Sequence, residues 1–132
     1  MFYLYNLCGN IMCADDDQSC LLDGSGSRIV MVVHGTSGSV LELRSLVIIN
    51  GYHAGDGGGL YIIGGAQVSL VVCSIQRNEV TSEGGGIYVV TSDTVVDLYG
   101  VSFSGNTASD GADIYRHSGT VTVYSECSAG EN

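Results

Sequence analysis

Two sets of residues that could do chemistry recur at a fixed interval of 27 positions along this chain. One set is aromatic and comprises Tyr61, Tyr88 and Tyr115, and the other is acidic and comprises Asp56, Glu83 and Asp110. Regularly spaced tyrosines could form a platform for a sugar ring or another protein, or they could stack on one another at about 0.5–1.5 kcal/mol per pair. We favour the stacked ladder and keep ligand binding by the tyrosines as the alternative.

The acidic set directly precedes a glycine-rich segment in each case, so equivalent carboxylates would lie one repeat apart. With strands about 4.8 Å apart, two carboxylates repel by ~0.9 kcal/mol in water and by ~3.5 kcal/mol at an effective dielectric constant of about 20. Partly shielded acids would favour a cation such as Ca²⁺, which takes several oxygen ligands, and Asp113 could supply another oxygen. A calcium site at the acidic set is therefore a hypothesis, set against a solvated acidic edge.

The interval of 27 residues belongs to a whole repeated unit. Residues 57–83 and 84–110 are each 27 residues long, and both open with three glycines, an aliphatic residue and a tyrosine. The unit starts again at residue 111, and residues 40–56 match its second half. The elements that must position the tyrosines and the acids are therefore copies of one structural unit.

Each unit contains three short segments in which apolar residues alternate with polar or aromatic ones. In the unit 84–110 these segments are residues 87–89, 96–98 and 101–103. A period of two is typical of strands with one buried face, and three strands per unit indicate one coil of a solenoid with parallel pairing. An antiparallel sandwich or meander, the alternative, does not explain the constant interval. The sequence thus predicts an all-β, single-stranded parallel β-helix of about four coils, with 27–28 residues per coil.

Two short motifs in the unit are shared with a known kind of repeat. They read GGGI at residues 84–87 and FSGN at 103–106, with weaker copies GGGL at 57–60 and IQRN at 75–78. These motifs resemble the paired signatures GGA-I and F-x-x-N of polymorphic outer membrane proteins, and the whole coil resembles the pectin-lyase-like fold. The resemblance covers roughly residues 20–125. It implies a right-handed helix and specifies fold more than activity.

The asparagines that close the second motif, Asn78 and Asn106, fall at equivalent turns of successive coils. Stacked asparagines add hydrogen bonds along the axis of such a stack. We therefore predict that Asn78 and Asn106 bond to each other between coils.

The ends of the chain are less regular than its middle. We assign residues 1–19 to an N-terminal cap or irregular segment, 20–125 to the β-helix, and 126–132 to a tail that resembles the start of a cysteine-rich module. Arg116 takes an inward position that Ile62 holds in an earlier coil, so the stack is expected to fray or end near it. We expect the chain to be part of a larger polypeptide.

The five cysteines leave at least one thiol unpaired within the chain. Cys8, Cys13 and Cys20 cluster before the repeats, at gaps that match no common zinc finger. A disulfide from Cys20 to either Cys13 or Cys8 is the expected use of this cluster, and we take Cys13–Cys20 as the working hypothesis. Cys73 takes an inward position, where a buried and inert thiol is expected.

Acidic residues outnumber basic ones, with 14 Asp and Glu against 4 Lys and Arg and a net charge of −10. Such a charge repels phosphate backbones and anionic lipid surfaces, and no apolar run reaches the roughly 18 residues of a membrane span. We therefore expect no nucleic-acid partner, no membrane span and no required cofactor. A glycan or a protein surface is the expected partner.

The outward rows of the expected coils offer little for catalysis. The second strands would present Glu42, Ser69, Asp97 and Thr122, a row without the two adjacent acids that glycoside hydrolysis needs. We predict no catalytic residue, and a non-catalytic structural or recognition segment of a secreted or cell-surface protein, used for adhesion, spacing or binding. A fragment of a polysaccharide lyase or glycosidase and a calcium-stabilised structural module are the alternatives.

Overall fold

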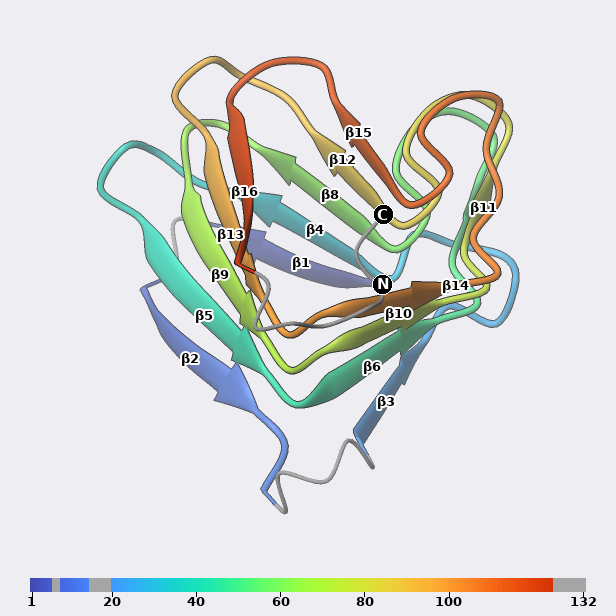
Figure 1. The fold of residues 1–132 in the computed structure, drawn as a ribbon, viewed down its shortest axis with the longest axis horizontal. Helices are drawn as coiled ribbons and strands as arrows, with labels where there is room; N and C mark the ends of the chain where they lie inside the picture. Colours follow the sequence, from blue (N-terminus) through green and yellow to red (C-terminus); the bar gives the residue numbers. More distant parts are fainter. Residues whose placement is uncertain (6–7, 15–19, 125–132) are drawn as a thin grey trace.

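Short alternating segments of the chain become strands that pair in parallel with their equivalents one coil away, and the result is a β-solenoid of about four turns (Figure 1). The computed structural model describes residues 1–5, 8–14 and 20–124, and this part contains strands and no helix. Three walls of parallel strands run along the solenoid, and a short two-stranded sheet lies between the third wall and the first. The predicted all-β parallel solenoid is therefore confirmed, and the antiparallel sandwich is excluded.

Each wall collects equivalent strands from successive coils. The first wall has the order β1 (Phe2–Tyr5), β4 (Met31–His34), β8 (Leu60–Ile63), β12 (Ile87–Val89) and β15 (Ile114–Arg116). The second wall has the order β2 (Gly9–Met12), β5 (Val40–Arg44), β9 (Gln67–Val71), β13 (Val95–Tyr99) and β16 (Thr120–Tyr124). The third wall consists of β3 (Cys20–Asp23), β6 (Leu46–Ile49), β10 (Ser74–Gln76) and β14 (Ser102–Ser104), and the short sheet of β7 (Tyr52–His53) and β11 (Glu79–Val80).

The pairing register reproduces the repeat of the sequence. Ile87 in β12 pairs with Leu60 in β8 on one side and with Ile114 in β15 on the other. In the second wall, Val96 of β13 pairs with Val68 of β9. Equivalent residues of the repeated unit therefore lie directly above one another.

Alternation along the strands decides which side chains fill the solenoid. Met31, Leu60 and Ile87 form one inward column of the first wall, and each is at most 1% exposed. Leu43 and Leu70 of the second wall belong to the same buried cluster. The core is thus continuous from coil to coil, which is how a solenoid buries apolar surface that one repeat cannot bury alone.

The first glycine of each glycine-rich motif is required by its backbone and by its neighbour. Gly57, Gly84 and Gly111 have φ angles of 72°, 72° and 59°, a left-handed conformation that favours glycine. A Cβ on Gly84 would also lie 2.8 Å from the Cβ of Tyr88, closer than real side chains approach. The glycine therefore permits the tight turn and leaves room for the tyrosine side chain that packs against it.

Another left-handed residue turns the chain from the second wall to the third. Ser45, Val72 and Gly100 hold this corner in three successive coils, with φ angles of 58°, 53° and 62°. A β-branched residue such as Val72 adopts this conformation at a cost, whereas glycine adopts it freely. The corner therefore repeats in the backbone even where the side chain does not.

The walls begin earlier in the chain than the assigned boundary at residue 20. β1 and β2 both lie within residues 1–19, and they pair in parallel with β4 and β5. The segment assigned to a cap or irregular region therefore supplies two strands of the stack. These strands lack the glycine-rich motif and the 27-residue spacing, so the repeat did not reveal them. The predicted tail, 126–132, lies outside the described residues.

Candidate functional site

The three tyrosines of the aromatic set lie in one column on the first wall. Tyr88 of β12 pairs in register with Tyr61 of β8 and with Tyr115 of β15. The ring centroids of Tyr61 and Tyr88 are 5.1 Å apart at an interplanar angle of 41°, and those of Tyr88 and Tyr115 are 5.8 Å apart at 6°. The rings therefore form a continuous ladder along the solenoid.

The ladder leaves little aromatic surface for a ligand at its centre. Tyr88 has a ring neighbour on each side, and only 5% of its surface is exposed. A sugar ring packs on an open aromatic face, and the faces of Tyr88 are already in use. The geometry therefore favours the stacked ladder over an aromatic platform at this position.

The acidic set lies at the start of the same wall and is joined through the backbone. The Asp56 carboxylate accepts a hydrogen bond from the backbone N–H of Glu83 at 3.1 Å. Glu83 and Asp110 face each other as a parallel bridge. The three residues are thus equivalent in position, as their spacing predicts.

The acidic and aromatic columns interact electrostatically. Burial, together with the smaller effect of the negative charges of Asp56 and Glu83, raises the pKa of Tyr88 to about 12. The pKa of Tyr115 is raised first by its hydrogen bond to the Glu83 side chain and then by that carboxylate's charge. Each acid precedes a tyrosine by five positions in all three coils, so the two columns run side by side, but this offset does not specify that Glu83 reaches Tyr115. The two columns are therefore one structural unit.

Within residues 1–5, 8–14 and 20–124, no group of three or more His, Cys, Asp or Glu side chains is placed to hold a metal ion. Asp56 instead bonds to the backbone of Glu83, and Asp113, expected as a further oxygen ligand, accepts a hydrogen bond from the Asn106 amide at 3.0 Å. The acids are therefore used, in part, as hydrogen-bond acceptors between and within coils.

The asparagines of the second motif bond between coils, as predicted. The Asn78 amide donates to the Asn106 side-chain oxygen at 3.0 Å and to the Ile48 carbonyl at 3.1 Å, and its own oxygen accepts the Gly51 N–H at 2.8 Å. The Asn106 amide repeats the contact one coil later, donating to the Ile75 carbonyl at 3.0 Å. Asn78 is fully buried, so each of these bonds replaces a lost contact with water.

Two further columns of interacting side chains were not predicted from the sequence. The N–H of Gly64 donates to the Thr91 hydroxyl at 3.1 Å, and the N–H of Thr91 donates to the Ser118 hydroxyl at 2.8 Å. Tyr99 and Tyr124 stack on the second wall with centroids 4.5 Å apart at 6°. Gly64, Thr91 and Ser118 are spaced by 27 positions, which is the signal that could have found the hydroxyl column.

A disulfide joins Cys13 to Cys20, whose Cα atoms are 5.5 Å apart. It lies at the corner where β2 leads to β3. The next coil makes this corner with Ser45 alone, whereas Cys13 and Cys20 are separated by 7 positions in the sequence. The bond therefore closes the corner across an insertion. Cys8 is exposed.

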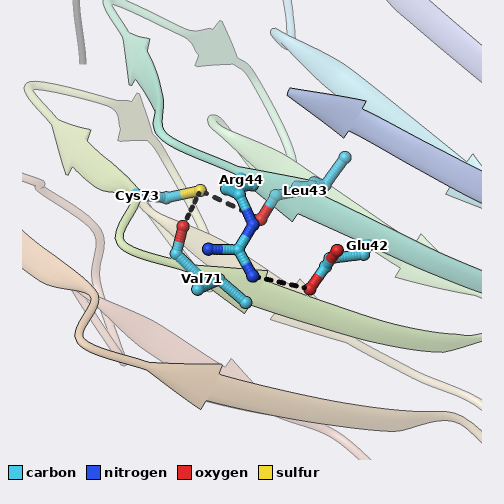
Figure 2. Close-up of polar contacts among 5 residues, drawn as sticks. All are labelled: Glu42, Leu43, Arg44, Val71 and Cys73. Carbon is cyan, nitrogen blue, oxygen red and sulfur yellow. Dashed lines mark hydrogen bonds and ion pairs between the residues drawn. The ribbon is translucent and has the colours of Figure 1, made fainter. Parts of the chain in front are cut away.

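Cys73 is buried, and Figure 2 shows its sulfur beside backbone carbonyl groups. Its Sγ lies 3.4 Å from the Leu43 oxygen and 3.6 Å from the Val71 oxygen. Burial raises the pKa of this thiol, which disfavours the reactive thiolate. Arg44 forms an ion pair of 3.3 Å with Glu42, also drawn in Figure 2.

The outward row of the second wall keeps its acids apart. Asp97 lies between Ser69 and Thr122 in the register. Glu42 lies next to Ser69 and is already paired with Arg44. The row therefore brings together no pair of neighbouring carboxylates.

A cleft of about 400 Å³ lies in the first two coils. Its lining includes Arg28, Tyr52 and His53. The His53 Nδ1 is 2.8 Å from the Asp56 carbonyl oxygen. None of the tyrosines or acids of the two repeated sets lines this cleft.

Comparison with protein-family models, with curated proteins and with solved structures finds no match to this chain. The fold itself defines the class, which is that of parallel β-solenoid repeat proteins. No helix in the described part of the chain is long and apolar enough to cross a membrane.

Proposed function

We propose that this chain is a non-catalytic β-helix segment of a secreted or cell-surface protein, with a structural and recognition role. The observation that carries the proposal is the use of its repeated side chains. Tyr88 stacks on Tyr115, Asn78 bonds to Asn106, and Thr91 bonds to the backbone of the previous coil. Side chains used in this way hold coils together and are poor candidates for acids, bases or nucleophiles. The stack would serve as a spacer that displays its outer surface.

Within this proposal the solenoid is right-handed and of the pectin-lyase-like type, and its motifs correspond to those of polymorphic outer membrane proteins. The hydrogen bond between Asn78 and Asn106 supports this assignment. It gives the asparagine of the F-x-x-N motif a structural role in two successive coils.

A secreted or cell-surface location is supported by the disulfide between Cys13 and Cys20. Disulfides form and persist in oxidising compartments and are rare in the cytosol. The net charge of −10 favours neutral glycans and protein surfaces over nucleic acids as partners.

Incubation with acidic and neutral polysaccharides tests the non-catalytic role. We expect no new reducing ends and no new unsaturated ends, because Asp97 has no neighbouring carboxylate in its row. Retention of an intact polysaccharide on the immobilised protein would support recognition. Turnover by the protein that disappears in the Asp97→Ala variant would overturn the proposal.

A further inference from the structure

The second wall carries a pair of exposed tyrosines on its outer face. Tyr99 of β13 pairs in register with Tyr124 of β16, and the two strands are neighbours in Figure 1. Leu98, which precedes Tyr99, is buried in the core, so the alternation of the strand turns both tyrosines outward. Tyr99 is 38% exposed and Tyr124 is 44% exposed. Solvent and dissolved reagents can therefore reach both phenols.

The two rings of this pair are close, parallel and aligned in the same sense. Their centroids are 4.5 Å apart and their planes are inclined by 6°. Desolvation is the first cause that raises the pKa of Tyr99, and a hydrogen bond between the side chains of Tyr99 and Tyr124 is another. A tyrosine side chain makes such a bond through its hydroxyl group, so the two hydroxyl groups lie side by side. The ring carbons ortho to the hydroxyl groups are therefore neighbours as well.

The other tyrosine pairs in the described part of the chain lack this combination. Both ring pairs of the first-wall ladder include Tyr88, which is 5% exposed, and their centroids are 5.1 and 5.8 Å apart. Tyr3 and Tyr5 are exposed, but their rings are 6.2 Å apart and inclined by 23°. Proximity, parallel rings and access from solvent therefore coincide at Tyr99 and Tyr124.

Neighbouring exposed phenols can be joined by oxidation. A one-electron oxidant removes an electron and a proton from each phenol and leaves a phenoxyl radical, whose unpaired electron is shared with the ortho carbons. Two such radicals combine by forming a carbon–carbon bond between ortho carbons, and the hydrogens of these carbons then move to the two oxygens. The product, dityrosine, has two hydrogen atoms fewer than the two tyrosines. A peroxidase passes the two electrons and two protons to hydrogen peroxide, which becomes two molecules of water.

We propose that Tyr99 and Tyr124 are a site of oxidative cross-linking, joined as dityrosine by a peroxidase and hydrogen peroxide. The stacked rings must turn edge to edge to form the bond, and exposed side chains change rotamer within picoseconds to nanoseconds. The bond would tie β16 covalently to β13, at the end of the second wall opposite β2 and the disulfide of Cys13.

Use of this bond in the organism rests on the proposed secreted or cell-surface location, because the cross-link needs an oxidising compartment. The reactivity of the purified chain does not rest on it. A chain that fails to couple leaves the result with polysaccharides as it stands, so the two proposals fail separately.

Treatment of the full chain with a peroxidase and limiting hydrogen peroxide, at low protein concentration, tests the cross-link. Cys8→Ser and Cys127→Ser remove thiols that would consume the oxidant. Arg116 lies between the two tyrosines, so trypsin leaves them on separate peptides that only the new bond joins. We expect mass spectrometry to find this linked pair with two hydrogen atoms fewer, together with dityrosine fluorescence. The melting temperature is expected to rise by about 5–15 °C, as a disulfide cross-link would raise it.

Tyr99→Phe keeps the stacked ring and removes the phenol, so it tests the reaction without disturbing the fold. It is expected to lower the yield of the intramolecular link at least about tenfold, because coupling depends on the proximity of two phenols. Tyr5→Phe is the matched control, since Tyr5 is 60% exposed and its ring stacks on His34. It is expected to leave the yield within about twofold, as a change at a distant site.

Three outcomes would overturn the proposal: an equal yield in Tyr99→Phe, a main product that links Tyr124 to another tyrosine, or links between chains alone. The same reaction in concentrated urea gives a second measurement. In the unfolded chain Tyr115 is nearer to Tyr124 in sequence than Tyr99 is, so their link is expected to predominate there. An undiminished preference for Tyr99 in urea would show that the fold does not direct the coupling and would contradict the proposal.

Discussion

The coil that begins at Gly84 and the coil that begins at Gly111 follow the same path but tolerate different side chains. A Cβ on Gly85 would lie 2.6 Å from the carbonyl oxygen of Ala112, so the middle coil excludes any side chain there. Ala112 itself, at the equivalent position of the last described coil, carries an exposed methyl group. The second glycine of the motif is therefore required by the coil stacked above it, and the requirement ends where the stack ends.

The largest expected effect on stability comes from placing alanine, the residue at position 112 of the last described coil, at the equivalent position of the coil that begins at Gly84. Gly85→Ala is expected to lower the free energy of unfolding by about 3 kcal/mol or more, because backbone atoms must move to admit the methyl group. Ala112→Gly, the reverse change at the equivalent position, is expected to cost about 1 kcal/mol or less. Urea denaturation of both variants measures the difference. Equal losses would show that the turn itself, and not the stacked coil, demands glycine.

A second contrast concerns Asn78 and Asn106, the equivalent asparagines of the coils that begin at Gly57 and Gly84. Asn78→Ala leaves the Gly51 N–H and the Ile48 carbonyl without their side-chain partner in a buried site, so a loss of about 2–3 kcal/mol is expected. Asn106→Ala acts at a half-buried position that water can reach, and about 1 kcal/mol is expected. Denaturation midpoints at an unchanged m-value measure both changes. A larger loss at Asn106 would contradict the view that burial decides the cost.

The smallest effect is expected from alkaline pH. Tyr88 has a pKa of about 12 in the fold against 10.0 for a free tyrosine, so the folded state holds its proton more tightly than the unfolded state. Stability from this group is complete below pH 10 and is lost as the pH rises through about 12. Thermal melts between these pH values are expected to show a decline that is shallower in Tyr88→Phe. An identical decline in that variant would assign the effect to other groups.

The vertical neighbours in the stack could be predicted from the sequence, because a parallel solenoid places equivalent residues above one another. The bond from Asn78 to Asn106 and the stacking of Tyr88 on Tyr115 both follow from the spacing of the repeat. Contacts between different columns could not be predicted in the same way. The interaction of Glu83 with Tyr115 depends on how a side chain leans across the turn, which spacing does not specify.

Backbone conformation that depends on neighbouring coils also could not be predicted from the sequence. Valine disfavours the left-handed conformation, so nothing in its type identifies Val72 as a corner residue. Its conformation is instead shared with Ser45 and Gly100 in the adjacent coils. The strands β1 and β2 were missed for a related reason, since their place is determined by pairing with β4 and β5.

The disulfide between Cys13 and Cys20 makes one end of the solenoid more resistant to unfolding than the other. A solenoid loses structure from its ends inward, because each coil is held mainly by its neighbours. At one end, a covalent bond holds β2 and β3 together even when their hydrogen bonds open. In the described part of the chain, the coil with β15 and β16 has no such closure. Under force or brief heating, unravelling would therefore start at β16 and travel toward the first coil.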